Sequence, residues 1–318
     1  MDSYKKYNSY KAFTIETIIL NEPLAFDLYI NNSSRLVKFI KSGDTLSFDK
    51  KEKLLQNGVD HFYLSSHHSK AFDTYLTNHL GTVLSSPYLN KKQKSKIIYS
   101  SAIHIMQDMF ESDISQSKIM IAKDIMTETV KQIISNNVTA ASILQLSTHD
   151  YQTYSHCVNV ALYSIGMAHE HGLDEAMIHK IASGAILHDL GKCKIDQCII
   201  NKQGKLSLDE FEAMKEHPQY SYETLISNGE TCPETLEIVL NHHEKLDGSG
   251  YARALREKEI SFAAQIVTIA DIFDALTSNR SYKEAESFFN ALKIMKEEMK
   301  EQLNIKLVDS LIKMMGKA

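Results

Sequence analysis

Cysteine and proline are scarce in this 318-residue sequence, which contains four of each. The cysteines form no CxxC pair and show no zinc-ligand spacing, which excludes a cysteine-based zinc site; they are Cys157, Cys193, Cys198 and Cys232. We expect them to be reduced thiols of a cytoplasmic protein. The few prolines, with no low-complexity stretch and no internal repeat, exclude a proline-rich or repeat architecture.

Long hydrophobic runs are also missing. No apolar segment approaches the roughly 20 residues that span a bilayer, and residues 1–13 lack the hydrophobic region of a secretion signal. We therefore expect no membrane span, and any role at a membrane would need a partner. The net charge of −5 argues against a nucleic-acid polymer as ligand, whereas a nucleotide can still bind in a locally positive cleft.

The hydrophobic pattern divides the chain into three regions, so we expect a mainly α protein. In residues 1–88 we expect a small α+β regulatory or interaction domain, with strand-like runs at 13–20, 25–30, 36–40 and 59–64 and a helix from the Ser47 cap to Gln56. Residues 89–147 are helical almost throughout. They predict a helical connector through which two copies of the chain can pair, although a packed bundle fits equally well. Residues 148–318 predict an all-helical bundle.

The segment Leu187–Lys192 is the most informative stretch. His188 and Asp189 continue an apolar helical face, and Gly191 is expected to end that helix as its C′ residue. A buried charge must be paired or must coordinate a metal. For the dipeptide alone, a hydrogen-bonded core histidine beside a helix-terminal aspartate is an equally good interpretation.

Histidines and aspartates recur at helix ends and on buried faces in the C-terminal region. The candidate ligands are His156, His188, Asp189, His217, His242, His243 and Asp271. Imidazole and carboxylate suit iron, manganese or zinc. Seven ligands are too many for one catalytic ion but suit two ions, with Asp189 as the natural bridge between them.

Several motifs together resemble the HD-GYP family of the HD phosphohydrolase superfamily. They are His188-Asp189 with Gly191-Lys192, His242-His243-Glu244, Asp247-Gly248-Ser249-Gly250-Tyr251, residues 269–277, and Arg280-Ser281-Tyr282-Lys283. The match covers about residues 148–300. The resemblance implies an HD-type helical bundle and a metal-dependent phosphodiesterase that hydrolyses cyclic di-GMP to pGpG, GMP or both by attack of a metal-bridging hydroxide.

The resemblance also assigns roles to single residues. Positions that match His156, His188, Asp189 and Asp271 hold one metal in that family, and those that match Asp189, His217, His242 and His243 hold the other. Lys192, Tyr251, Arg280 and Lys283 are the expected substrate contacts, and Asp189 and Lys192 the catalytic residues. We expect two divalent ions, iron first and manganese as the alternative. A diguanylate cyclase domain is a possible partner.

Three departures from the family pattern bear on these expectations. Gln152 stands where members with a third metal carry a glutamate, so we expect two metals rather than three. Ala252 replaces the proline of the GYP motif, which frees φ there and puts partner binding in doubt. The turn 280–283 also lacks its usual proline.

Other interpretations compete with turnover. A weakly active or inactive protein of this family would sense cyclic di-GMP or dock to a cyclase. A hydrolase of another nucleotide would need only a single-metal ligand set, which leaves three histidines unexplained. Asp274 is expected to support a ligand histidine rather than bind metal.

Overall fold

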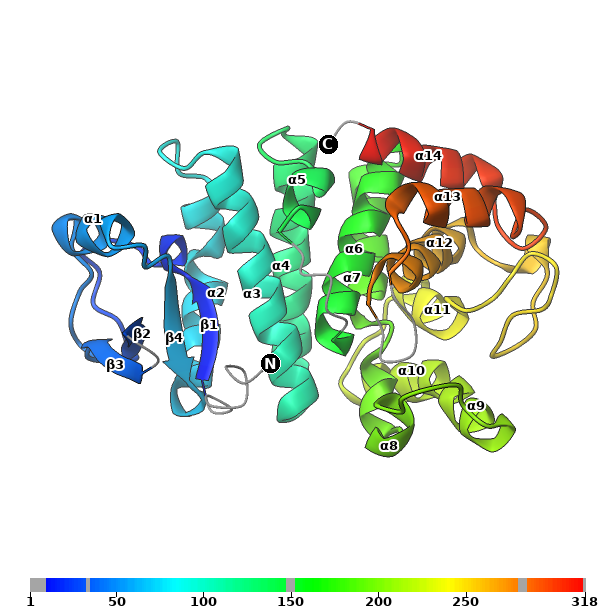
Figure 1. Cartoon of the computed structure of the whole chain (residues 1–318), viewed down its shortest axis with the longest axis horizontal. Coiled ribbons are helices and arrows are strands. Elements are labelled where there is room, and N and C mark those ends of the chain that lie inside the picture. Colours follow the sequence, from blue (N-terminus) through cyan, green and yellow to red (C-terminus); the bar gives the residue numbers. More distant parts are fainter. Residues whose placement is uncertain (1–9, 33–34, 147–151, 280–284, 317–318) are drawn as a thin grey trace.

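The computed structural model describes residues 10–32, 35–146, 152–279 and 285–316, and two hydrophobic cores organise this part of the chain. Figure 1 shows a small sheet at one end of the long axis, a layer of long helices in the middle, and the C-terminal helices at the other end. The molecule is mainly α, as the sequence predicts. Among the described residues, no helix combines the length and apolarity that a membrane crossing requires.

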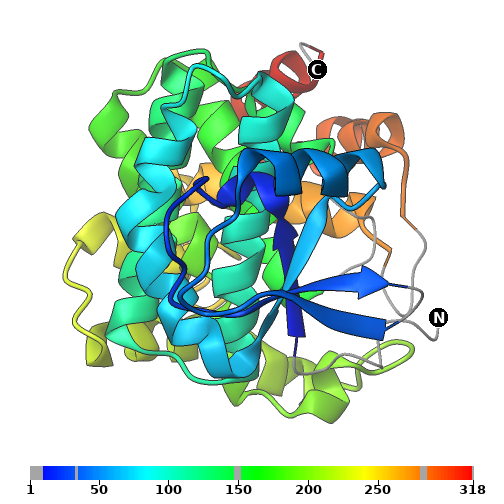
Figure 2. The same ribbon diagram turned by 90° about the vertical axis from the view of Figure 1, so that its left-hand side faces the viewer.

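The N-terminal unit is an antiparallel sheet backed by a helix. Its strands are β1 (Tyr10–Thr14), β2 (Leu28–Asn32), β3 (Arg35–Ile40) and β4 (His61–Ser65), in the order β1-β4-β2-β3. Helix α1 (Phe48–Gln56) starts at Ser47, whose side chain accepts from the Lys50 amide, as the sequence predicts. Helix α2 (Ser69–Leu84) packs Phe72, Tyr75 and Leu76 into the core of this N-terminal unit. Figure 2 shows the sheet in front of the helical layers.

The run at 13–20 is not a continuous strand, so that prediction is wrong in its extent. β1 ends at Thr14, and residues Ile15–Thr17 form a 3-10 turn in which the Ile18 amide donates to the Ile15 carbonyl. Ile15 and Ile18 are buried all the same. A short apolar run reports burial, and the backbone can achieve that burial in a turn as well as in a strand.

The middle layer consists of α3 (Lys91–Glu111), α4 (Gln116–Ile134) and the short α5 (Ala140–Leu144). The apolar faces predicted for this region are buried within the chain: Ile97, Ile105 and Met106 are at most 1% exposed. They belong to the same core as the C-terminal helices, with which α3 and α4 pack through α6 (Thr153–Glu170) and α7 (Glu175–Leu187). A dimer through these helices stays a prediction.

The C-terminal part contains α8 (Gln197–Ile200), α9 (Leu208–Lys215), α10 (His217–Ser227), α11 (Pro233–Asn241), α12 (Phe262–Thr277), α13 (Phe288–Glu297) and α14 (Ile305–Met315), and the 3-10 turn η4 (Leu190–Lys194) follows α7. Two capping predictions are confirmed: Ser207 and Glu210 form a capping box on α9, and Pro233 opens α11. Helices α6 and α12 are apolar on most sides and therefore lie inside the bundle.

Candidate metal centre

Seven predicted ligands come from five segments and meet at one place in the C-terminal bundle. His156 lies in α6, His188 caps the C-terminal end of α7, and Asp189 follows it at the start of η4. His217 opens α10, at the bend that Pro218 imposes. His242 and His243 follow α11, and Asp271 lies in α12. Six of the seven are buried, and the His243 side chain is 21% exposed.

Asp189 lies at the centre of this cluster, and its two oxygens face different histidines. Oδ2 lies 3.4 Å from Nε2 of His156 and 3.4 Å from Nε2 of His188. Oδ1 lies 3.1 Å from Nε2 of His217 and 4.0 Å from Nε2 of His242. A carboxylate in this arrangement can contribute one oxygen to each of two ions.

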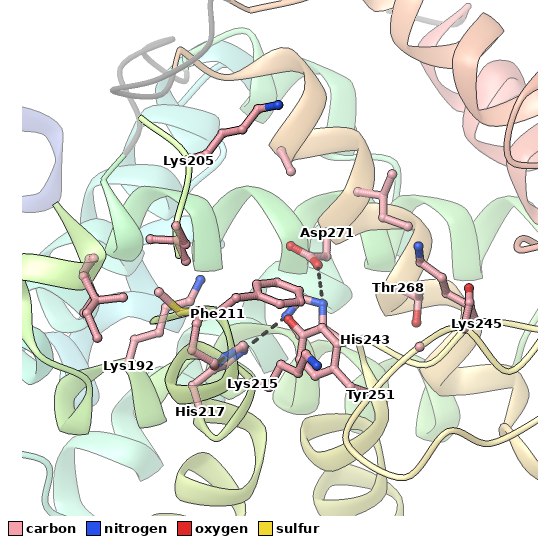
Figure 3. Close-up of a pocket in the computed structure, with 18 of the residues that line it drawn as sticks. Lys192, Lys205, Phe211, Lys215, His217, His243, Lys245, Tyr251, Thr268 and Asp271 are labelled. Carbon is pink, nitrogen blue, oxygen red and sulfur yellow. Dashed lines mark hydrogen bonds and ion pairs between the residues drawn. The ribbon is translucent and has the colours of Figure 1, made fainter. Parts of the chain in front are cut away.

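The remaining ligand atoms divide into two groups around that carboxylate. Asp189, His217, His242 and His243 offer donor atoms within 4.8 Å of one another, and His156, His188 and Asp271 do the same. Nδ1 of His243 also lies 3.3 Å from Oδ2 of Asp271, so the two groups touch on a second side (Figure 3). These clusters of histidine and aspartate have the composition and compactness that divalent metals require.

The histidine rings are held so that one nitrogen faces inward. The Nδ1 atoms of His188, His217 and His242 lie 2.6–2.8 Å from the carbonyl oxygens of Ala185, Met214 and Val239. Since a carbonyl only accepts, each Nδ1 carries the proton and each Nε2 presents a lone pair to the cluster.

This arrangement fits bound cations. His217 and His242 bring two acceptor nitrogens within 3.3 Å of each other, and His243 Nε2 lies 3.2 Å from the same His217 atom. Within the described residues, His188 Nε2 and Asp189 Oδ1 are buried with no hydrogen-bond partner. Buried acceptors that face one another without donors are costly unless a cation lies between them.

Five side chains of the cluster have pKa values that favour the forms that can bind a cation. Burial lowers the pKa of His217, lowers that of His242 well below its usual range, and lowers that of His243 to about 3. Burial alone would raise the pKa of Asp189, but Lys192 and His188 bring it well below the usual value. His156 and His243 outweigh burial in the same way and lower the pKa of Asp271. His217, His242 and His243 are therefore neutral, and Asp189 and Asp271 ionised, at neutral pH.

Asp274 hydrogen-bonds to the candidate ligand His156, as predicted. Its Oδ2 accepts from Nδ1 of His156 at 2.8 Å, and its Oδ1 accepts from the Asn159 side-chain amide at 2.9 Å. Asn159 was not predicted, although it lies three residues after His156 on the same helix. The position of Cys157 beside the cluster was also not predicted: its buried thiol lies close to His188 and Asp189. Burial raises the pKa of this thiol well above the usual value, so it stays protonated.

Gly191 corrects one prediction. It does not end α7, which stops at Leu187, but lies inside the following 3-10 turn. A Cβ atom at this position would lie 2.1 Å from the His217 carbonyl oxygen and 2.5 Å from the Ser221 amide nitrogen. The glycine therefore allows η4 to approach α10 closely, and this contact brings Asp189 to His217.

The glycine-rich loop after α11 is held from inside the bundle. Glu244 is buried, and its carboxylate accepts from the backbone amides of Arg253 and Leu255 at 2.6 and 2.9 Å. A Cβ on Gly250 would lie 2.5 Å from backbone atoms of His243 and Glu244. Despite Ala252, the loop is thus attached to the segment after α11 that contains the candidate ligands His242 and His243.

The substrate residues predicted from the resemblance divide into two sets. Lys192 places its ammonium 2.5 Å from Oδ2 of Asp189, and the Tyr251 ring packs on the His243 ring with centroids 4.5 Å apart. Both residues line a cavity beside the metal centre. Arg280 and Lys283 lie outside the described residues.

The lining of this cavity is rich in lysine although the whole chain is acidic. It measures about 800 Å³ and reaches the ligands His217, His243 and Asp271. Its described lining carries five lysines, Lys192, Lys202, Lys205, Lys215 and Lys245, and the carboxylate of Asp271. Three of these lysines pair with carboxylates outside the lining, those of Asp189, Glu210 and Glu212. Figure 3 shows Lys205 and Lys245 on different sides of the centre. An anionic ligand with more than one phosphate suits such a lining.

Comparisons with known proteins agree with this geometry. A family model described as the HD domain matches residues 121–306, which is more than half of the chain. The chain is 31% identical over 176 residues to the cyclic di-GMP phosphodiesterase PA4108 of Pseudomonas aeruginosa, covering 55% of this chain and 42% of that protein. It is 37% identical over 158 residues to 3′3′-cGAMP-specific phosphodiesterase 2 of Vibrio cholerae, covering 49% of this chain and 29% of that protein.

The chain spans less than half the length of these curated relatives. A solved structure resembles it almost from end to end: Bd1817, an HDG"Y"P protein from Bdellovibrio bacteriovorus, has a TM-score of 0.68 and 19% identity, covering 96% of this chain and 99% of that one. At this identity the likeness concerns the fold alone.

Proposed function

The chain belongs to the HD domain family, and on that premise we propose that it is a two-metal phosphodiesterase that hydrolyses cyclic di-GMP to pGpG, GMP or both. The observation that carries the proposal is the position of Asp189, whose two oxygens face two different groups of histidines. A single-metal site would leave His217, His242 and His243 without a role. Gln152, at the start of α6, offers an amide where a third ion would need an anionic ligand, which supports two ions rather than three.

We assign one ion to His156, His188, Asp189 and Asp271, and the other to Asp189, His217, His242 and His243. Two divalent ions, when bound, would activate a water for in-line attack on phosphorus and polarise the phosphodiester. Iron and manganese both suit imidazole and carboxylate ligands.

The protein residues orient the substrate and balance its charge. The Lys192 ammonium lies beside Asp189 at the edge of the cavity, where it can approach a phosphoryl oxygen and offset the charge that grows during attack. The outward hydrogen bonds of the histidine Nδ1 atoms keep the rings from rotating. Tyr251 closes one side of the cavity against His243.

The same fold could also act as a cyclic di-GMP sensor that docks to a cyclase, with residues 1–88 as the regulatory unit. The sheet unit with its own core and the alanine at position 252 favour this second role. The complete ligand set favours turnover.

The test is metal analysis together with a turnover assay. Protein loaded with manganese, or with iron under anaerobic conditions, is expected to hold about two ions per chain and to hydrolyse cyclic di-GMP; 3′3′-cGAMP serves as the rival substrate. Asp189→Ala should abolish hydrolysis and metal binding, whereas Asp309→Ala, at an exposed ion pair with Lys296, should change neither. Metal-loaded protein that binds dinucleotide without hydrolysing it would reject the enzyme and support the sensor.

A further inference from the structure

The cavity has an apolar wall that neither hydrophobic core uses. Five apolar side chains from the segment around α8 and α9 line it: Ile199, Ile200, Leu206, Phe211 and Met214. None of them belongs to either core cluster of the described residues, and α9 buries no residue fully. An apolar surface of this kind inside a lysine-lined cavity suggests a ligand that is anionic in one part and apolar in another.

Phe211 is the aromatic residue of this wall. It is 42% exposed, and it lies in Figure 3 beside the ligands His217 and His243. Its ring meets the Tyr251 ring edge-on, with centroids 6.3 Å apart and an interplanar angle of 80°. Tyr251 in turn packs on His243. Phe211 is therefore the outer member of an aromatic series that begins at a metal ligand.

Lys215, one helical turn after Phe211, covers one face of the ring with its ammonium, 4.9 Å from the centroid. Glu212 pairs with this ammonium at 2.6 Å and keeps it near the ring. A flat ligand would therefore stack on the other face of Phe211. Ile272 and Leu276 of α12, a different helix, add further apolar lining to the cavity.

We propose that Phe211 and Lys215 form a subsite in which a purine base of the substrate stacks on the Phe211 ring while its phosphate reaches the metal centre. A nucleotide combines the two properties that the cavity requires, since every base has a π-face and every phosphate a negative charge. This inference rests on the proposed function and adds the part of the substrate that α9 recognises.

The chain contains no tryptophan, which permits a direct binding test. Phe211→Trp places a single tryptophan at the subsite, and Leu208→Trp places one on the same helix at a position that is 84% exposed and does not line the cavity in the described structure. With manganese-loaded protein, GMP should quench the fluorescence of Phe211→Trp, whereas ribose 5-phosphate, which lacks a base, should not. Leu208→Trp should respond to neither. Equal responses of the two variants, or no quenching by GMP, would overturn the subsite.

Kinetics provide the second readout. Phe211→Ala is expected to raise KM for cyclic di-GMP by roughly tenfold, with kcat changed less than twofold and unchanged manganese content; Phe211→Tyr should restore KM. An unchanged KM in Phe211→Ala would contradict the proposal. If wild-type protein has no turnover but GMP quenches Phe211→Trp, the phosphodiesterase assignment fails while the base subsite stands.

Discussion

Asp274 fixes the orientation of the His156 ring, one of the proposed metal ligands. Its carboxylate accepts from His156 Nδ1 and from the Asn159 amide, and all three side chains are buried. A carboxylate behind a ligand histidine fixes the tautomer of the ring and makes its other nitrogen a stronger ligand.

We therefore expect Asp274→Asn to weaken metal binding by roughly 10- to 100-fold without removing a ligand. Manganese titration in competition with a chelator would measure this effect. Asp309→Asn, on the surface of α14, provides the control. Equal affinity of Asp274→Asn and wild type would show that the carboxylate does not act through His156.

Single functional residues can be predicted from the sequence where a polar or ionisable side chain occurs at a position expected to be buried. The seven candidate ligands and Asp274 stand out because acids and imidazoles on buried faces need a partner. Asn159 and Phe211 do not stand out, because an amide in a helix and a phenylalanine near a helix end are ordinary. Their roles depend on what other helices bring next to them, and spacing along one helix does not contain that information.

The contact between η4 and α10 depends on one glycine. A side chain on Gly191 would meet backbone atoms of α10, which cannot move aside as a flexible side chain can. The two segments carry Asp189 and His217, so their separation would move apart two of the proposed metal ligands.

Gly191→Ala is thus expected to destabilise the protein by about 1–3 kcal/mol and to lower its manganese content. Urea denaturation and metal analysis would test both effects. Gly81→Ala in α2 is the matched control: its Cβ would lie 3.4 Å from the flexible Glu128 carboxylate, and alanine favours the helix, so stability should stay equal or rise. Equal effects of the two substitutions would refute the role of close approach.

The helices were easier to predict than the strands. The caps Ser47 and Ser207, and Pro233 in the first turn of α11, mark helix starts through local chemistry, and the structure confirms them. The strand predicted at 13–20 is wrong in its extent because the apolar residues after Thr14 are buried in a 3-10 turn. The C′ position predicted for Gly191 is wrong for a similar reason: a glycine after a helix can allow close packing instead of ending the helix.

A buried ion-pair network connects the sheet to the middle helices. Asp108 of α3 pairs with Lys11 of β1 and Lys118 of α4, each at 2.7 Å, and the Lys11 and Asp108 side chains are at most 8% exposed. Both lysines outweigh burial and hold the pKa of Asp108 below its usual value. The carboxylate therefore stays ionised and joins three elements.

Asp108→Asn removes the carboxylate closest to the buried Lys11 ammonium. The remaining carboxylate, that of Glu111, lies 3.9 Å away. We expect a loss of about 3 kcal/mol in the free energy of unfolding, measured by urea denaturation. Asp60→Asn tests an exposed pair, with Lys96, and should cost below about 1 kcal/mol. A loss no larger than that of the exposed pair would mean that the network contributes little.

The middle helices share one apolar interior with the C-terminal bundle, and this determines how the protein can be divided. A fragment cut at residue 148 would leave the surfaces of α6 and α7 that contact α3 and α4 bare to water, and such a fragment would be prone to aggregate. The same interior also contains Leu80, Val83 and Leu84 of α2, so expression of the metal-binding part needs to retain α2 as well as α3 and α4.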